Sequence, residues 1–321
     1  MKFPPIDPSR ARTRRLATLA RIVARDQFAT PLAAGASLND FLAALPDVLA
    51  ARDLRSLARA IASAKRNRRP FLLMMGAHPL KVGLGPIIAA LIRDRIISAL
   101  AANGAAIIHD FELAFAGRTS EDVGTGLADG SFGMAAETGA FLNNAARTAA
   151  REGRGLGAVV GREILNSRFK FRSASIFAAA AEAGIPATVH VTVGADIIHM
   201  HPDADGAAIG AATMADFHQL AAVAAQLSRG VVLNLGSAVV MPEVFLKALN
   251  LARNLGHRVE NFTAADMDFI RQYRPRINVV DRPTSGGGRG IVLTGHHELM
   301  FPLLAAAIRE ELARAPRRAK T

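Results

Sequence analysis

Histidine side chains give the clearest chemical signal in the sequence, because six of the nine lie in or beside short polar segments. These six are His78, His109, His199, His201, His296 and His297. Carboxylates lie near them in the sequence, namely Asp110, Glu112, Asp196, Asp203, Asp205 and Glu298. Imidazole and carboxylate groups together can hold Zn²⁺, Mn²⁺ or Fe²⁺. They can equally transfer protons near neutral pH, or simply form hydrogen bonds within turns.

A divalent metal site is one hypothesis that this pattern supports. His199 and His201 are two residues apart, a spacing that puts both side chains on one face of an extended chain. The candidate metal ligands are His199, His201, His296 and His297.

Alternating apolar segments indicate the scaffold that would position these residues. Short apolar or β-branched runs predict strands at 71–75, 96–102, 187–193, 231–235, 258–263 and 291–294. Helical periodicity follows in between, at 85–95, 173–183, 214–227, 242–255 and 299–313. This alternation predicts an α/β fold with a doubly wound, mostly parallel sheet and helices on both faces.

The first 69 residues show helical periodicity without predicted strands. Leu16, Leu19, Ile22 and Val23 recur at helical spacing, and a second periodic stretch ends near Pro70. We therefore expect a helical N-terminal arm over 1–69, followed by an α/β nucleotide-binding domain over 70–321.

The segments after the predicted strands are the expected ligand site. In open parallel sheets, ligands bind beyond the carboxyl ends of the strands. Glycine lets the backbone approach a ligand closely, and the next helix offers free N–H groups to an anion. The expected nucleotide-binding residues are Asn103, Gly104, Asp196, Gly236, Ser237, Thr263 and Ala264. Tight turns need glycine in any case, and no G-x-G-x-x-G pattern follows the first predicted strand.

Lysines offer two further candidates. Lys81 follows the first of these turns, and Lys247 lies on the predicted helix after the fourth. Either amine could clamp a phosphate or form an imine, and a solvated surface role is the alternative.

Composition and charge exclude several classes of protein. The chain has no Cys, which rules out disulfides, zinc–thiolate sites and thiol nucleophiles. The net charge is +12, with +5 over 1–26 and +6 over 52–69. Aromatic residues make up only 5%, so we interpret these runs as solvated basic faces and consider nucleic acid an unlikely partner.

Targeting signals are weak. No apolar stretch approaches the ~20 residues of a membrane-spanning helix, and no secretory signal pattern begins the chain. The expected location is cytoplasmic, without membrane association, and an Arg-rich organelle transit peptide is the alternative.

From about Phe71 onward, the order of the turns resembles deoxyhypusine synthase and its relatives. The segment 100–104 stands where that family has Thr-Thr-Ala-Gly-Gly, and 194–196 is similar to its Asp-Gly loop. The segment 235–240 is similar to Gly-Gly-Gly-Val-Val, 263–264 matches a cofactor-contacting Thr-Ala, and 301–304 repeats a phrase of the last helix. The resemblance implies a sirtuin-like NAD-binding fold, NAD as a transient hydride acceptor, and a homo-oligomer, possibly a tetramer.

The chain departs from that family where its chemistry takes place. The glycine run 284–290 replaces the segment that carries the family's catalytic lysine. Pro242 and Glu243 stand where the family has a pair of histidines, and His296 and His201 replace two aspartates. The resemblance therefore implies the scaffold and NAD, and it does not imply aminobutyl transfer to a protein lysine.

The leading functional hypothesis is an enzyme that binds NAD or another nucleotide and acts on a small polar substrate by hydride-coupled elimination or group transfer. Its acid–base candidates are His109, Glu112, His201, Glu243 and His296. The alternatives are a metal-dependent lyase or hydrolase and a non-catalytic binding protein on the same scaffold.

Overall fold

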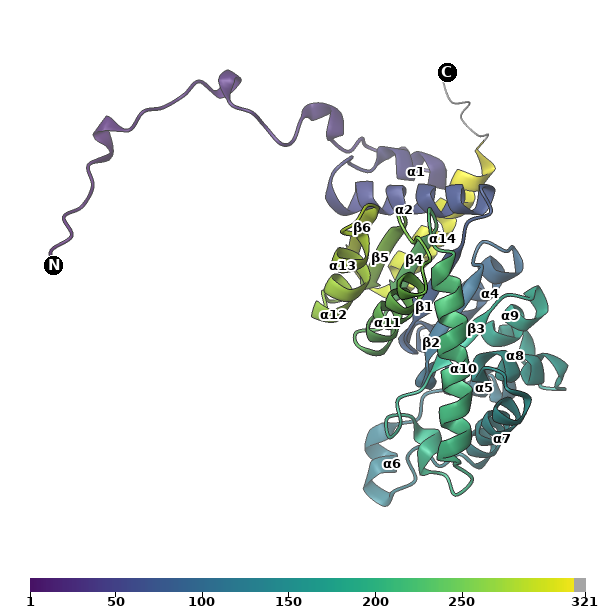
Figure 1. The fold of residues 1–321 in the computed structure, drawn as a ribbon. Coiled ribbons are helices and arrows are strands. Elements are labelled where there is room, and N and C mark those ends of the chain that lie inside the picture. Colours follow the sequence, from purple (N-terminus) through teal and green to yellow (C-terminus); the bar gives the residue numbers. More distant parts are fainter. Residues whose placement is uncertain (315–321) are drawn as a thin grey trace.

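Six parallel strands form one sheet in the order β3-β2-β1-β4-β5-β6 in the computed structural model, which describes residues 1–314 (Figure 1). The strands are β1 (Phe71–Met75), β2 (Ala99–Asn103), β3 (Ala187–His190), β4 (Val231–Leu235), β5 (Thr263–Asp268) and β6 (Arg289–Thr294). The chain winds outward in both directions from the β1–β4 pair, so the prediction of a doubly wound parallel sheet is confirmed. This pair is the topological switch point of the sheet.

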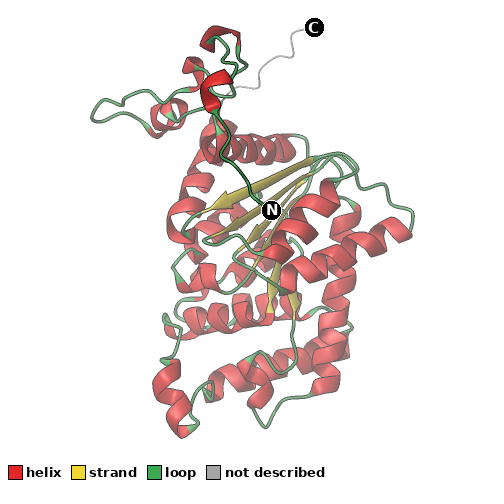
Figure 2. Ribbon diagram, turned by 90° about the vertical axis from the view of Figure 1, so that its left-hand side faces the viewer, coloured by secondary structure: helices red, strands yellow, loops and turns green. Residues whose placement is uncertain are grey.

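Helices cover both faces of the sheet (Figure 2). One core contains α2 (Leu49–Arg66), α4 (Gly85–Arg93), α5 (Gly104–Ala116), α7 (Ala136–Glu152), α8 (Leu156–Asn166), α9 (Ile176–Ala183) and α14 (His297–Ala313). The other contains α10 (Gly206–Ala225), α11 (Val240–Asn254) and the π-helix Arg276–Asp281. Successive residues of β1 alternate between the two cores, which explains why the whole strand is apolar and buried.

Short helices complete the chain. They are α1 (Leu38–Ala44), α3 (His78–Lys81), α6 (Val123–Asp129), α12 (Tyr273–Pro275) and α13 (Arg282–Thr284). The connection from β2 to β3 is the longest and holds α5 to α9. Within residues 1–314, no helix combines the length and the apolarity needed to cross a membrane.

The N-terminal arm is helical only in its second half. The prediction of a helix around Leu16, Leu19, Ile22 and Val23 is wrong, because residues 1–36 form only short 3₁₀ turns and extended chain, drawn purple in Figure 1. Leu16 and Ile22 are exposed and pack against nothing that would stabilise an isolated helix. The second periodic stretch forms α2 as predicted.

The strand predicted at 258–263 lies five residues further along the chain. Asn261 has a left-handed backbone (φ 57°), which bends the segment before ladder pairing begins at Thr263. The actual strand, Thr263–Asp268, contains alanines and aspartates, residue types that are depleted in strands. This shift moves Thr263 and Ala264 to the amino-terminal edge of the sheet.

Candidate active site

The turns after β2 and β3 meet at the start of α5. Asn103 caps this helix, because its side-chain oxygen accepts a hydrogen bond from the Ala106 amide at 3.2 Å. A Cβ on Gly104 would lie 2.0 Å from a carboxylate oxygen of Asp196, which comes from the segment after β3. The structure therefore brings together Asn103, Gly104 and Asp196, and Gly104 is glycine because the Asp196 carboxylate occupies the adjacent space.

One turn further along α5, three side chains form a hydrogen-bonded relay. The Thr119 hydroxyl lies 2.6 Å from Nδ1 of His109 and donates its proton to Glu112. Because a hydroxyl has only one proton to give, Nδ1 of His109 donates to Thr119, and Nε2 is left with a free lone pair. The spacing of His109 and Glu112 on the helix predicts their proximity, whereas Thr119 and its neighbour Thr138 were not predicted.

The protonation state of the relay follows from burial. Burial, and secondarily the positive charge of Lys81, lowers the pKa of His109 to about 4. Burial raises the pKa of the Glu112 carboxyl. His109 is therefore neutral at pH 7, and its Nε2 can accept a hydrogen bond from a donor in the site.

A cavity of about 210 Å³ lies against this relay. Its charged and titratable lining residues are Lys81, His109, Glu112, Glu121 and Asp196. Ile108, Val123, Phe132 and Ile197 contribute apolar walls. Burial raises the pKa of Asp196 to about 6, so this carboxyl is mostly ionised at pH 7. Three carboxylates against one lysine give the cavity, which we call the acidic pocket, a negative character that suits a small cation.

A second polar region lies at the β1–β4 switch point. The carbonyl oxygen of Gly236 would be 2.3 Å from a Cβ on Gly76, so the turns after β1 and β4 touch through their backbones. A Cβ on Gly236 would itself meet the His297 ring at 2.6 Å. These two glycines are thus required by packing between protein segments, rather than left open for a ligand.

The floor of this region contains buried polar atoms without partners. His297 is buried, and neither ring nitrogen makes a hydrogen bond within residues 1–314; its nearest charged neighbour is the Asp268 carboxylate at 3.5 Å. Asn234 donates to Asp266 at 2.8 Å, and its own amide oxygen has no partner in that part of the chain. Burial raises the pKa of Asp266 to about 6.

Asp266 and Asp268, which lie within β5, were missed because that strand was predicted too early. The signal that could have found them is the alternation of aspartate with apolar residues at 264–268, which is the period of a strand. Aromatic side chains lie above the same floor: Phe269 stacks against His296 at 6.5 Å between centroids, and His78 lies 5.3 Å from His297.

Several predicted residues lie outside these two regions. Glu243 is on α11, where it pairs with Lys247, Arg274 and Asn278, so its charge is already neutralised. Ring nitrogen Nε2 of His201 lies 2.8 Å from the backbone carbonyl of Gly133, and the ring is buried. His296 is exposed, and Nδ1 of its ring lies 3.8 Å from the Glu298 carboxylate. Thr263 and Ala264 begin β5, at the far edge of the sheet, so their predicted place beside the other turns is wrong.

The predicted metal ligands do not converge. His199 and His201 follow β3, whereas His296 and His297 follow β6, and these are the two edge strands of the sheet. Five strand spacings separate the two edges, roughly 24 Å. In the part of the chain that the structure describes, no group of three or more His, Asp or Glu side chains is placed to hold a metal ion. The metal hypothesis is therefore wrong for these residues.

Comparison with known proteins gives a fold and no family. No protein-family model matches the chain. No curated protein sequence matches it either. Unliganded AgrE is similar at 14% identity and a TM-score of 0.52, over 82% of this chain and 34% of AgrE. The ternary complex of AgrE with ornithine and NAD⁺ is similar at 14% identity and a TM-score of 0.50, over 81% of this chain and 33% of AgrE.

A chain from Entamoeba histolytica provisionally named deoxyhypusine synthase is similar at 12% identity and a TM-score of 0.48, over 85% of this chain and 93% of that one. This chain thus spans about a third of the length of AgrE. The likeness to AgrE at this identity shows a shared doubly wound α/β fold alone.

Proposed function

We propose that this protein is an enzyme that binds an NAD-type dinucleotide at the carboxyl edge of the sheet and oxidises a small amine held in the acidic pocket. The observation that carries the proposal is the pocket itself, where a neutral imidazole with a free nitrogen faces a cavity lined by three carboxylates. Its lining residues Lys81, His109 and Asp196 follow β1, β2 and β3, beside the switch point where dinucleotides bind in doubly wound sheets.

The switch point suits a dinucleotide, although not in the usual Rossmann manner. The helix directly after β1 has only four residues and follows no glycine-rich fingerprint. Its N-terminus is therefore a poor binding site for a diphosphate. The 15-residue helix α11 follows β4 instead, and its N-cap residue Val239 is half-exposed and makes no side-chain cap. At this end Pro242 has no N–H, and the Met241 amide donates to the Ser237 hydroxyl at 3.2 Å. The helix therefore offers a diphosphate the Val240 amide and the positive end of its dipole. The unpartnered nitrogens of His297 give the floor beside it a further polar contact.

When bound, NAD⁺ would supply a hydride acceptor for the C–H bond next to the amine. The substrate would arrive as an ammonium, held by the Asp196 and Glu121 carboxylates and donating a hydrogen bond to the neutral Nε2 of His109. Thr119 and Glu112 keep His109 in the tautomer that can accept this bond. One proton must leave the substrate nitrogen before the hydride does, and Asp196, with its pKa raised to about 6, is a stronger base than His109 and would accept it. Loss of the hydride would then leave an iminium ion, whose carbon would be open to water or to a second amine. The balance is one ammonium and one NAD⁺ giving one iminium, one reduced cofactor and one proton.

The ligands of AgrE guide the choice of probes. AgrE was crystallised with ornithine and NAD⁺, and ornithine is a small amine of the class that the acidic pocket suits. Norvaline has the same carbon chain without the terminal amine and is the matched control.

The test is calorimetric titration of NAD⁺, and then of ornithine and norvaline in the presence of NAD⁺, combined with absorbance at the wavelength of the reduced cofactor. We expect NAD⁺ to bind and to raise the melting temperature, and ornithine to bind at least 10-fold more tightly than norvaline. If NAD⁺ at millimolar concentration produces no heat, the proposed dinucleotide binding is wrong. If ornithine and norvaline bind with equal affinity, the proposal that the acidic pocket recognises a side-chain amine is wrong. The expected cytoplasmic location and homo-oligomer stay predictions.

A further inference from the structure

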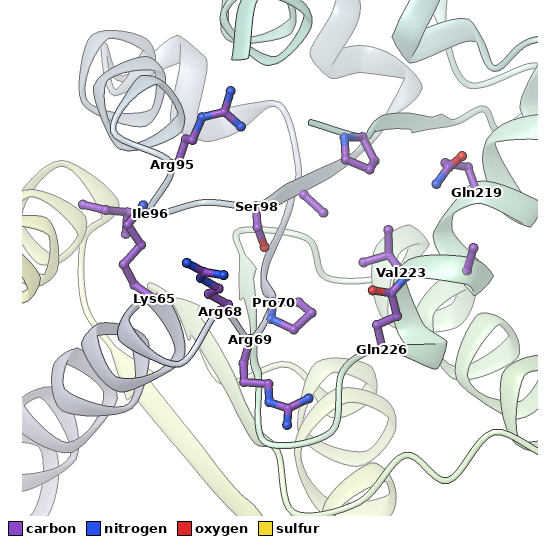
Figure 3. A pocket seen from close by; sticks show the side chains of 13 residues that line it. Lys65, Arg68, Arg69, Pro70, Arg95, Ile96, Ser98, Gln219, Val223 and Gln226 are labelled. Carbon is purple, nitrogen blue, oxygen red and sulfur yellow. The ribbon is translucent and has the colours of Figure 1, made fainter. Parts of the chain in front are cut away.

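The opposite edge of the sheet contains a second cavity, of about 390 Å³, at the amino-terminal ends of β1, β2 and β3. Lys65, Arg68, Arg69 and Arg95 line it, and no acidic residue does. We call it the basic pocket. Figure 3 shows Lys65, Arg68 and Arg95 on one side, facing Gln219 and Gln226 across the cavity.

The basic run at 52–69 supplies three of these cations. Other basic residues of the same run hold parts of the fold together through hydrogen bonds. Arg55 and Arg66 donate to backbone carbonyls of α1 and α14. Within residues 1–314, Arg68, Arg69 and Arg95 make no side-chain hydrogen bond or ion pair. The nearby Asp94 does not neutralise them, because its carboxylate pairs with Arg309 at 2.6 Å.

Backbone strain distinguishes two of these arginines. Arg68 and Arg95 each follow the C-cap residue of a helix, α2 and α4, and both have a left-handed backbone with φ of 53°. Glycine is the usual residue at this position, because any side chain there is strained. The fold alone would favour glycine at both positions. Two strained arginines on one cavity wall therefore suggest that their side chains have a functional role.

The ordinary explanation is that cations near helix C-termini favour the negative end of the helix dipole. It suffices for Lys65, whose ammonium donates to the carbonyl of Asp94 at the end of α4. It does not suffice for Arg68 and Arg95, whose guanidinium groups donate to no carbonyl in the described part of the chain.

We propose that the basic pocket binds a small polyphosphate, namely a nucleoside di- or triphosphate, at a site distinct from the acidic pocket. Arginine forks match phosphate oxygens, and the glutamine amides opposite can bond to the uncharged part of the ligand. The volume lies within the range of small-molecule sites. No aromatic side chain lines the cavity, so it lacks the stacking surface that single-stranded nucleic acid uses.

The test is titration of ATP and pyrophosphate into the full chain by calorimetry, at fixed ionic strength, with wild type and two variants. The double variant Arg68→Gly/Arg95→Gly removes both strained arginines. Arg229→Gly is its control, because Arg229 also has a left-handed backbone (φ 62°) on the same edge and does not line the pocket.

We expect ATP affinity to fall at least 10-fold in the double variant and to stay within 2-fold in Arg229→Gly. We also expect the double variant to melt no lower than wild type, because glycine relieves the strain. Three outcomes would overturn the proposal: no binding of either probe at millimolar concentration, an equal loss in Arg229→Gly, or a double variant that melts lower while binding ATP normally. If an oligonucleotide binds more tightly than ATP, and both the double variant and Arg229→Gly lose this binding equally, the basic region is a nucleic-acid surface instead.

Discussion

The carboxylate of Asp196 occupies the space beside Gly104 where any larger residue would put its Cβ, at 2.0 Å. This one contact joins the end of β2 to the segment after β3 and fixes one wall of the acidic pocket.

Replacing Gly104 with Ala should displace Asp196 and impair the pocket. We expect a loss of about 1 kcal/mol in the free energy of unfolding, together with weaker amine binding. Gly206→Ala is a matched control, because Gly206 is also the first residue of a helix after an Asp or Asn cap, and its Cβ would meet nothing within 4 Å. That variant should be neutral or slightly more stable. Chemical denaturation measures both variants, and equal effects would contradict this role of Gly104.

Asp196→Asn should weaken amine binding by about 10-fold at pH 8, or about 1.4 kcal/mol, while preserving the shape of the pocket. Because burial raises the pKa of Asp196 to about 6, its negative charge is lost as the pH falls through that value. Wild-type affinity for ornithine should therefore fall between pH 7 and pH 5, and the variant should show a flatter dependence. Calorimetry across this range tests the prediction, and an unchanged pH dependence in the variant would exclude Asp196 as the group responsible.

Asp216 makes the stability of the fold sensitive to pH. Its carboxylate is buried and accepts hydrogen bonds from the Val189 and Gly157 amides at 2.9 and 3.0 Å. Burial raises its pKa to about 7, so the folded chain keeps a proton that the unfolded chain releases near pH 4. The Asp216 contribution therefore reduces stability as the pH rises from 4 to 7, by at most about 1.4 kcal/mol per unit.

Asp216→Asn should remove this slope, because the amide keeps an acceptor oxygen and cannot ionise. The variant should match wild type below pH 4 and exceed it above pH 7 in urea denaturation. Asp129 is the control, since hydrogen bonds from Ser131 lower the pKa of that exposed carboxyl and Asp129→Asn cannot flatten the slope. A variant less stable than wild type at pH 8 would contradict the account.

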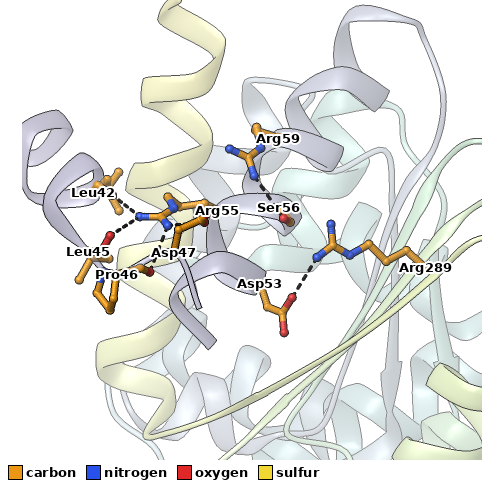
Figure 4. A network of polar contacts seen from close by, with 9 residues as sticks. All are labelled: Leu42, Leu45, Pro46, Asp47, Asp53, Arg55, Ser56, Arg59 and Arg289. Carbon is orange, nitrogen blue, oxygen red and sulfur yellow. Dashed lines mark hydrogen bonds and ion pairs between the residues drawn. The ribbon is translucent and has the colours of Figure 1, made fainter. Parts of the chain in front are cut away.

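Arg55 attaches α1 to α2 through a fork of hydrogen bonds (Figure 4). Its guanidinium donates to the carbonyls of Leu42, Leu45 and Pro46 at 2.8 to 3.1 Å and to the Asp47 carboxylate at 2.8 Å. A lysine cannot reproduce this geometry, so Arg55→Lys should cost about 2 kcal/mol and speed amide exchange over residues 38–48. Arg59→Lys, one turn later on α2, loses only a bond to Ser56 and should change little. Similar exchange in both variants would show that the fork does not hold α1.

How far the sequence predicts this protein depends on how local each signal is. The apolar runs that form β1 and β4 are recognisable because a short, continuous apolar segment is typical of a strand buried on both faces. The strand β5 was misplaced because a single left-handed residue, Asn261, decides where pairing starts. A left-handed backbone at a residue other than glycine has no reliable signal in the sequence. The N-terminal periodicity failed for a different reason, since helical spacing has no effect where nothing packs against the apolar face.

The candidate site was predictable where its residues share a helix. His109 and Glu112 are three residues apart on α5, so their pairing follows from helical geometry. Thr119, which links them, and Asp196, which completes the pocket, come from other segments whose positions depend on tertiary packing. His199 and His201 show the converse, because a two-residue spacing aligns side chains only in an extended chain and this segment is a 3₁₀ turn.

Val239→Asp tests where a dinucleotide would bind. Val239 is exposed, so this substitution at the start of α11 should leave stability nearly unchanged. Its charge would nevertheless repel a diphosphate at the same helix end. Val239→Asn is the neutral control and should retain binding.

Calorimetric titration of NAD⁺ into wild type, Val239→Asp and Arg68→Gly/Arg95→Gly is the most direct measurement of the central claim, because it also separates the two edges of the sheet. The account predicts that NAD⁺ binds wild type and the double arginine variant alike and fails to bind Val239→Asp. Binding that survives in Val239→Asp and disappears in the arginine variant, or no binding to any of the three, would contradict it.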